Sequence, residues 1–277
     1  MNSKQRDIYN DVIASLDIDK VKASITQDAP MFFDRDDIAL VVDMVFAGTE
    51  KWLVHDIENY TLKKVEDKRE VIICDADPTH FVCDLEFTDN DEKDIIVDWK
   101  TSHRDLDLRW ENRYKDSWQW KTFLRVTNAD TFIYRGINTQ LKTRTVVLNR
   151  YPSMNDAVDL YYKLTSKARS QLVDFVPWPR NMPGACFAFG RDCPYKKDCQ
   201  RDTYPLTLIT PKSISYSTAD LFWLCPERSR RSELEKAEKG EGKEELKLET
   251  KDVYQREIGS AVHRGLGEIY KQVWRIS

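Results

Sequence analysis

Two aspartates and a lysine lie in neighbouring stretches whose composition is typical of β-strands. Asp84 falls within the apolar run 81–87 (FVCDLEF), and Asp98 and Lys100 fall within 95–102 (IIVDWKTS), with the acidic turn TDNDEKD between the runs. Side chains alternate between the two faces of a strand, so Asp98 and Lys100 share a face. If the two runs pair as a hairpin, all three side chains converge. Two carboxylates can hold a divalent cation, and a neighbouring lysine can place its charge beside an activated water.

An Asp-x-Lys pattern on a strand is common, and by itself it is more often structural than catalytic. Two features favour chemistry here. Asp98 interrupts an apolar run, where a carboxylate is costly to bury unless it is paired or bound to a metal. Asp84 supplies a second acid on the preceding stretch. The arrangement resembles the core of the PD-(D/E)XK nucleases, particularly their RecB-like branch, in which an Asp on one strand is followed by Asp-x-Lys on the next.

A glutamine further along the chain extends the resemblance. RecB-like nucleases carry a Gln-x-x-x-Tyr motif on the helix after the Asp-x-Lys strand, and Gln119 matches its first position. Phe123 stands at the second position, so the motif's tyrosine hydroxyl is absent there. The alternative interpretation is a polar residue on a Trp-rich packing helix. The resemblance implies that Gln119 orients the substrate or the catalytic lysine.

Periodicity predicts the elements that position these residues. Helices are expected at 4–24, 38–60, 106–126 and 154–173, with Gly48 as an interruption of the second. Strands are expected at 61–74, 81–87, 95–102, 131–136 and 143–150. This order predicts an α/β (α+β) fold with a central mixed β-sheet flanked by helices, and the resemblance implies a restriction-endonuclease-like core. The expected segments are a helical 1–60, a nuclease core 61–180, a cysteine segment 181–231, a charged linker 232–252 and a helix 253–277.

Cysteines gather in a Pro/Gly-rich stretch that has no clear periodicity. Cys186, Cys193 and Cys199 lie within fourteen residues, which suggests a metal, and Cys225 is the best fourth ligand. The spacing is not that of a zinc ribbon, which has two short Cys-x2-Cys pairs. The other two, Cys74 and Cys83, fall in the expected strands and are predicted to pack as small apolar side chains.

This cysteine pattern resembles a subgroup of RecB-like nucleases that binds a [4Fe-4S] cluster through one cysteine near the start of the domain and three near its end. The stretch from Cys193-Pro194 to Cys199 matches the end of the triplet, and Cys225-Pro226 matches the lone cysteine. The gap of six residues before Cys193 is longer than the family's commonest spacing. The resemblance implies a structural [4Fe-4S] cluster, with zinc or no metal as the alternatives.

A glycine and a histidine near the C-terminus form a further match. Gly259 and His263 fit the family's Gly-x-x-x-His motif, whose His contributes a metal ligand, and they lie in an amphipathic stretch that predicts a helix. In that family, however, this helix and the Cys-Pro segment precede the catalytic strands. A circular permutation explains the order, because domain termini often lie close together. Alternatively, 213–277 opens a second nuclease unit completed by another subunit or partner chain.

The composition sets limits on the function. The 277 residues carry a net charge of −4, so no global basic field points to nucleic acid. No apolar run is long enough for a membrane span, the N-terminus is unlike a signal peptide, and six cysteines indicate a reducing compartment. A cytoplasmic location in a bacterial or phage-infected cell is expected.

The expected function is that of a metal-dependent DNA nuclease, most readily an exonuclease. Mg2+ or Mn2+ would bind at Asp84, Asp98 and His263, and Lys100 and Gln119 would support the reaction. The partner is DNA, as single strands or duplex ends. Two alternatives stay open. One is a non-catalytic DNA-binding or assembly module with a nuclease-like fold, and the other is a zinc-stapled hydrolase with a different substrate.

Overall fold

The computed structural model describes residues 1–27, 34–74, 76, 78–172, 193–200, 216–240 and 250–275. The chain forms two compact units. The first, here called the sheet unit, contains Met1–Lys68, Val82–Tyr151 and Lys247–Ser277. The second, the cysteine unit, contains Arg69–Phe81 and Pro152–Leu246. The helix expected at 253–277 therefore belongs to the same unit as the stretches that carry Asp84 and Asp98.

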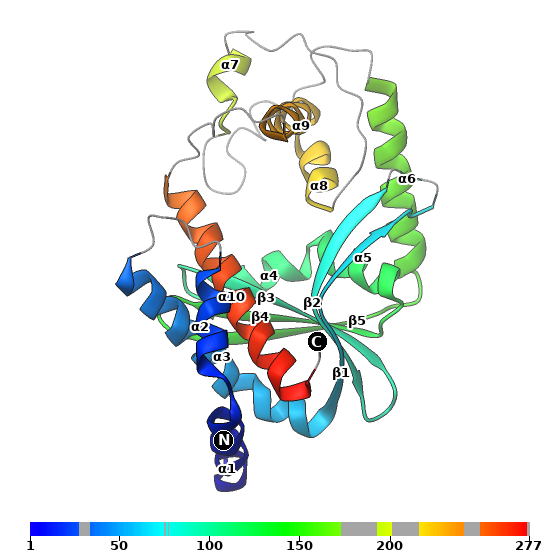
Figure 1. The fold of residues 1–277 in the computed structure, drawn as a ribbon. Helices are drawn as coiled ribbons and strands as arrows, with labels where there is room; N and C mark the ends of the chain where they lie inside the picture. Colours follow the sequence, from blue (N-terminus) through cyan, green and yellow to red (C-terminus); the bar gives the residue numbers. More distant parts are fainter. Residues whose placement is uncertain are drawn as a thin grey trace. The chain divides into compact units, whose positions relative to one another are not determined.

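A mixed five-stranded sheet is the centre of the fold (Figure 1). Its strands lie in the spatial order β1-β2-β3-β4-β5. Strands β2 and β3 are antiparallel, β3 and β4 are parallel, and β4 and β5 are antiparallel. The strands are β1 Tyr60–Val71, β2 Thr79–Asp89, β3 Asp94–Ser102, β4 Thr131–Asn138 and β5 Thr143–Asn149. The α+β class with a mixed sheet and helices is thus confirmed.

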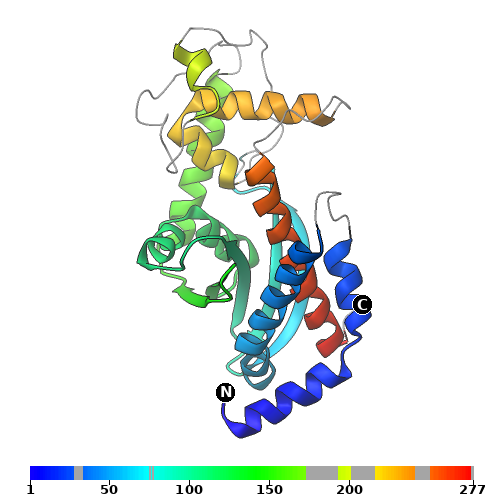
Figure 2. The ribbon, with the colours of Figure 1, turned by 90° about the vertical axis from the view of Figure 1, so that its left-hand side faces the viewer.

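Helices cover both faces of this sheet (Figure 2). On one face lie α1 Ser3–Ser15, α2 Ile18–Thr26, α3 Arg35–Asn59 and α10 Thr250–Trp274. On the other lie α4 Leu108–Lys115 and α5 Trp118–Thr127, which form the crossover that the parallel pair β3–β4 requires. Alternate residues of β2 and β3 point into the core under α3 and α10, and they include Leu85, Phe87, Val97 and Trp99. Asp98, which lies between Val97 and Trp99, points the other way and meets Gln119 of α5.

Three expected helices differ from the prediction. The stretch 4–24 is two helices. The first ends at Ser15 with Leu16 as its C-cap, and Asp17 caps the second by accepting a hydrogen bond from Lys20 N at 3.1 Å. The stretch 106–126 is likewise divided, with Ser117 as the N-cap of α5. The expected interruption at Gly48 is wrong. Helix α3 runs through it, and a Cβ there would lie 2.8 Å from Ile137 Cδ1, so this glycine permits close packing on β4.

A buried ionic network fixes α10 to the rest of the sheet unit. Arg135 of β4 donates two hydrogen bonds to Asp56 of α3, each 2.5 Å long, and the Tyr270 hydroxyl of α10 donates to the same carboxylate. Both partners of the ion pair are fully or nearly fully buried. A buried pair of this kind is strongly destabilised when one partner is removed, so the network holds three elements of distant sequence in one arrangement.

The cysteine unit contains four helices among its described residues: α6 Met154–Leu172, α7 Lys196–Gln200, α8 Tyr216–Leu224 and α9 Pro226–Gly240. The prediction of an exposed charged linker at 232–252 is wrong at both ends, because α9 extends to Gly240 and α10 begins at Thr250. Arg169 of α6 is buried and donates two hydrogen bonds to Glu233 at 2.8 and 2.9 Å. Arg169 and Glu233 thus pair between α6 and α9. Residues 241–249 lie outside the described part of the chain.

The two cysteines expected in strands have different surroundings. Cys83 is fully buried in β2, as predicted. Cys74 is exposed and follows the end of β1, in a left-handed backbone conformation with φ of 52°. The prediction that it packs as a small apolar side chain is therefore wrong, because β1 ends at Val71, three residues earlier than expected.

Candidate active site

The predicted acids lie side by side on neighbouring strands. Leu85 of β2 pairs with Val97 of β3, and continuing this antiparallel register by one residue sets Asp84 beside Asp98. Both side chains are almost completely buried, with 8% and 3% of each residue exposed. The backbone N–H of Trp99 donates a hydrogen bond of 2.7 Å to Asp84 Oδ2. Strand pairing thus produces the convergence that the sequence predicts.

Asp98 is held from two sides. Lys100 Nζ lies 2.5 Å from Asp98 Oδ2, and Gln119 Nε2 of α5 donates a hydrogen bond of 3.0 Å to Oδ1. Lys100 is on the same face of β3 as Asp98 and keeps 20% of its side chain exposed. Lys100 is the ion-pair partner of the buried Oδ2, and no other hydrogen-bond donor from the described residues reaches this oxygen. This carboxylate oxygen is left with the capacity to bind a further positive group.

His263 comes to the site from the far end of the chain. Its Nδ1 lies 3.4 Å from Asp84 Oδ2, and its ring meets the edge of Trp99 at a centroid distance of 6.0 Å. One turn earlier on α10, Gly259 faces Thr101 of β3, and a Cβ at this position would lie 2.8 Å from Thr101 Oγ1. The glycine of the Gly-x-x-x-His pattern thus lets α10 approach β3 closely enough for the histidine to reach Asp84.

The charges of the site perturb one another. Burial raises the pKa of Asp98 to about 6, and repulsion from Asp84 adds to this, although Lys100 opposes it. Burial also acts to raise the pKa of Asp84, but His263, Lys100 and the Trp99 N–H together hold it below its ordinary value. Burial acts to lower the pKa of His263, but the negative charge of Asp84 outweighs this effect. The pKa of His263 is therefore raised, and the imidazolium is favoured. Two anions therefore face two cations in a nearly dry site.

Sequence reasoning missed two tyrosines beside these residues. The Tyr134 hydroxyl of β4 donates a hydrogen bond of 3.3 Å to Gln119 Oε1, and Tyr134 is fully buried. The ring of Tyr114 lies against the Tyr134 ring, with a centroid distance of 4.7 Å. Phe123 carries no hydroxyl, as the sequence shows, but β4 brings a different tyrosine hydroxyl to Gln119. The parallel register that sets Tyr134 opposite Asp98 has no signal in the local sequence.

The acid pair has the chemistry of a magnesium or manganese site. Among the described residues, no group of three or more His, Cys, Asp and Glu side chains is arranged to hold a metal ion. Mg2+, however, is commonly bound through one or two carboxylates together with water and substrate phosphates. Asp84 and Asp98 supply such a pair, and Asp98 Oδ2 is a buried oxygen that already has a positive group, Lys100, as its partner. The two aspartates fit a hard divalent cation, with His263 within reach of the same carboxylate.

Three of the four predicted thiol ligands lie in the described part of the cysteine unit. Cys193 and Cys225 are buried and Cys199 is half-buried, and all three are free thiols. Burial raises the pKa of the Cys199 thiol, which also senses Cys193, Cys225 and the guanidinium of Arg231 electrostatically. The three thiols are therefore within electrostatic reach of one another, although the described residues contain no group of three His, Cys, Asp or Glu side chains arranged to hold a metal ion. Cys225 lies between α8 and α9, Cys193 precedes α7, and Cys199 lies within α7. Cys186 lies outside the described residues.

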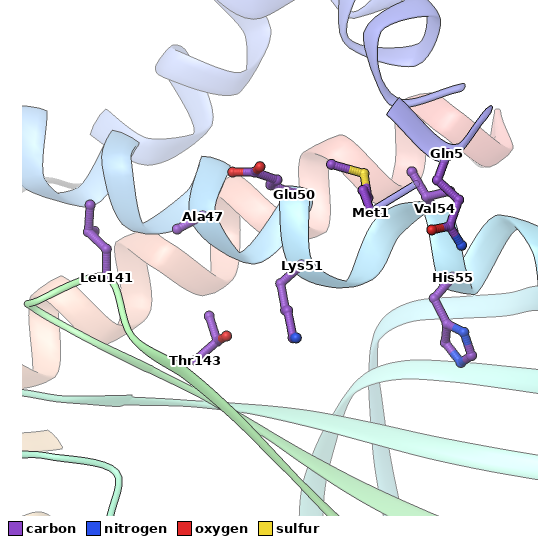
Figure 3. A pocket seen from close by; sticks show the side chains of 9 residues that line it. All are labelled: Met1, Gln5, Ala47, Glu50, Lys51, Val54, His55, Leu141 and Thr143. Carbon is purple, nitrogen blue, oxygen red and sulfur yellow. The ribbon is translucent and has the colours of Figure 1, made fainter. Parts of the chain in front are cut away.

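A hollow of about 370 Å3 lies elsewhere in the sheet unit (Figure 3). It is lined by residues of α1, α3 and the β4–β5 region, and none of the predicted site residues lines it. His55 borders it and contacts Asn59 of the same helix through Nδ1 at 3.1 Å, which is a structural role. None of the described helices combines the length and apolar character that crossing a bilayer requires.

Comparison with known proteins gives little. No family model matches the chain, and no curated protein matches it. Among solved structures the chain is similar to the crystal structure of SSO0001, with 18% sequence identity and a TM-score of 0.32. The similarity covers 47% of this chain and 59% of that chain, so it extends over less than two thirds of the other protein. A likeness of this strength carries no argument about function.

Proposed function

We propose that the protein is a metal-dependent DNA nuclease of the PD-(D/E)XK superfamily, RecB-like, with a restriction-endonuclease-like core. The observation that carries the proposal is the convergence of Asp84, Asp98, Lys100, Gln119 and His263, from β2, β3, α5 and α10, within hydrogen-bond or ion-pair reach of one another. A buried cluster of this kind is costly without a task, because two carboxylates lose their hydration. Perturbed ionisable groups concentrate at functional sites.

Asp84 and Asp98 would hold Mg2+ or Mn2+, with His263 as a further ligand. When bound, the cation would activate water and neutralise charge on the phosphate. Ionised acids are needed for this. Asp98, with its pKa of about 6, is ionised at neutral pH, and His263 has to release Asp84 in order to bind a cation itself. Lys100 and His263 lie beside the two carboxylates, where the metal cation is expected to bind.

Lys100 would orient the attacking water and stabilise the negative charge that develops on the phosphorus. It is suited to this role because it lies beside Asp98 on the same face of β3 and remains partly exposed to an incoming substrate. Gln119 would hold the other oxygen of Asp98 and so fix the direction of the carboxylate. Donors that are already in place when charge develops lower the barrier without reorganisation.

The approach of His263 to Asp84 favours a permuted single domain over a second, incomplete unit. The two residues are 179 positions apart in the sequence, yet both belong to the sheet unit. No other subunit is required to bring a histidine to the acids. On this proposal the motif order reflects a circular permutation, and the five site residues come from one chain.

The cysteine segment would carry a structural [4Fe-4S] cluster held by Cys186, Cys193, Cys199 and Cys225, with zinc as the lesser alternative. The electrostatic interaction of Cys199 with Cys193 and Cys225 supports this. Such a cluster would join α7 to the α8–α9 junction and contribute free energy of folding, as structural metals do. Its ligands lie in the other unit from the acids, so we assign it no part in the reaction.

A cleavage assay with end-labelled single-stranded and double-stranded DNA tests the proposal. The protein is purified anaerobically and assayed with Mg2+, Mn2+ or EDTA. Lys100→Ala is expected to abolish cleavage with its fold and iron content intact, whereas Lys93→Ala, an exposed lysine of the β2–β3 turn, should cleave as wild type does. Cleavage that survives Lys100→Ala or EDTA would refute the site. No cleavage from folded, iron-replete wild-type protein would favour the non-catalytic binding module.

A further inference from the structure

We propose that Tyr134 is a positioning residue of this site, which acts on Asp98 through Gln119 and on Lys100 through its ring. The inference rests on the proposed function, and it assigns a role to a residue that the sequence motifs do not include. Tyr134 stands directly opposite Asp98 in the parallel pairing of β3 and β4. It is fully buried, so its contacts are with protein rather than with substrate.

The hydroxyl selects the orientation of an amide. Tyr134 donates to Gln119 Oε1 at 3.3 Å, and Gln119 Nε2 donates to Asp98 Oδ1 at 3.0 Å. A glutamine amide can be turned so that either its oxygen or its nitrogen faces a neighbour. If it were turned, its oxygen would face the Asp98 carboxylate, acceptor against acceptor. A donor on Oε1 favours the other orientation, so the hydroxyl keeps Nε2 aimed at Asp98.

The ring of Tyr134 supports the second group on Asp98. Lys100 Nζ lies 5.7 Å from the Tyr134 ring centroid, within the range of a cation–π contact. Tyr114 and Phe132 confine the ring, each with a centroid distance of 4.7 Å to it. A ring that cannot move gives the lysine a fixed surface beneath its ammonium group. The mobile end of a long side chain is thereby kept beside Asp98 Oδ2.

One residue therefore contacts the partners of both Asp98 oxygens. Gln119 holds Oδ1, Lys100 lies at Oδ2, and Tyr134 touches both partners. The hydroxyl should affect how well the carboxylate is aimed, and so the affinity for Mn2+. The ring should affect where the lysine stands, and so the rate of cleavage. These two contributions can be separated, because Phe retains the ring and Leu does not.

The test is a double-mutant cycle between Tyr134→Phe and Gln119→Ala, with Mn2+ affinity measured in the absence of DNA and kcat measured on labelled DNA. Tyr134→Phe should weaken Mn2+ binding by up to about tenfold, the size of one buried hydrogen bond. In the Gln119→Ala background it should have no further effect. Tyr134→Leu should lower kcat beyond the loss seen with Phe. Equal losses in both backgrounds would overturn the inference, and so would Phe and Leu variants of equal kcat.

Tyr270→Phe is the matched control, because it removes another buried hydroxyl of the sheet unit from a network without Gln119. Its effects should simply add to those of Gln119→Ala. Coupling in Mn2+ affinity without any DNA cleavage would overturn the nuclease and keep the positioning role. DNA cleavage without coupling between Tyr134 and Gln119 would keep the nuclease and overturn the positioning role. A wild-type protein that neither binds Mn2+ nor cleaves would overturn both, and a Tyr134→Phe variant that does not fold would make the hydroxyl structural.

Discussion

Gly259→Ala sets two effects of opposite sign against each other. Gly259 lies in the interior of α10, where alanine is the better helix former by about 1 kcal/mol, so the helix taken alone should gain stability. Packing acts against this, because the new Cβ would lie 2.8 Å from Thr101 Oγ1 on β3. Ordinary contacts of a Cβ begin at about 3.4 Å, so α10 or β3 has to give way by about 0.6 Å.

The packing effect should prevail. Thr101 is part of a hydrogen-bonded strand and cannot withdraw as a long flexible side chain can, and overpacking of this kind costs about 1–3 kcal/mol. The net change is then a loss of up to about 2 kcal/mol in the free energy of unfolding. The displacement also moves His263, one turn further along, away from its 3.4 Å approach to Asp84. Mn2+ affinity should fall together with stability.

The assay is urea unfolding and Mn2+ titration of four proteins: wild type, Gly259→Ala, Thr101→Ala and the double variant. Thr101→Ala removes the clashing oxygen, and the remaining Cβ is 4.0 Å away, an ordinary contact. In that background Gly259→Ala should therefore be stabilising by about 1 kcal/mol, and the Mn2+ affinity should return. If Gly259→Ala is harmless in wild type, or is not rescued by Thr101→Ala, the account of the Gly-x-x-x-His pattern given above is wrong.

Three further predictions concern charge and thiols. The pKa of Asp98 is raised from 3.8 to about 6 in the folded protein, so between these values the folded state keeps a proton that the unfolded chain has released. The free energy of unfolding of wild type should therefore fall as the pH rises. Relative to Asp98→Asn, the fall should be about 3 kcal/mol between about pH 4 and pH 7. If the difference in the free energy of unfolding between Asp98→Asn and wild type does not grow with pH, this prediction is wrong. Asp56→Asn should destabilise the sheet unit by about 3–5 kcal/mol, since it leaves Arg135 buried beside a neutral group, whereas Asp105→Asn in the exposed pair with Lys142 should change the urea midpoint little. Cys199→Ala should lose its iron and unfold at lower temperature, and Cys74→Ser, at an exposed thiol, should keep both; an iron-replete Cys199→Ala protein would exclude this ligand.

The acids and the lysine could be predicted because their signal is local. Strand periodicity alone places Asp98 and Lys100 on one face, and a hairpin between adjacent runs places Asp84 beside them. The strands themselves appear within a few residues of their expected bounds, as β4 and β5 do. Two of the expected helices were divided by a cap. Asp17 and Ser117 each divide a run that hydrophobic periodicity alone makes continuous.

The rest of the site could not be predicted, because it depends on pairings between distant parts of the chain. Tyr134 belongs to a strand that looks like any other apolar run, and only the parallel register with β3 sets it against Gln119 and Asp98. The charged stretch at 232–240 was misinterpreted for a related reason. From composition alone, arginine and glutamate predict exposure to solvent. Arg169, however, pairs with Glu233 from another helix, and composition cannot indicate such a pairing.

His263 shows why the order of motifs in a chain need not match the order of parts in a site. Helix α10 is placed by what it packs against: apolar residues of α2 and α3, the close contact of Gly259 with β3, and the Tyr270 hydroxyl on Asp56. None of these contacts depends on whether the helix is made before the strands or after them. A permutation requires only that the connecting segments join the same helices and strands in a different order. A permuted chain can therefore keep the same histidine beside the same acid, and the loss of Tyr270 or a bulkier Gly259 should disturb the site more than the order of its segments does.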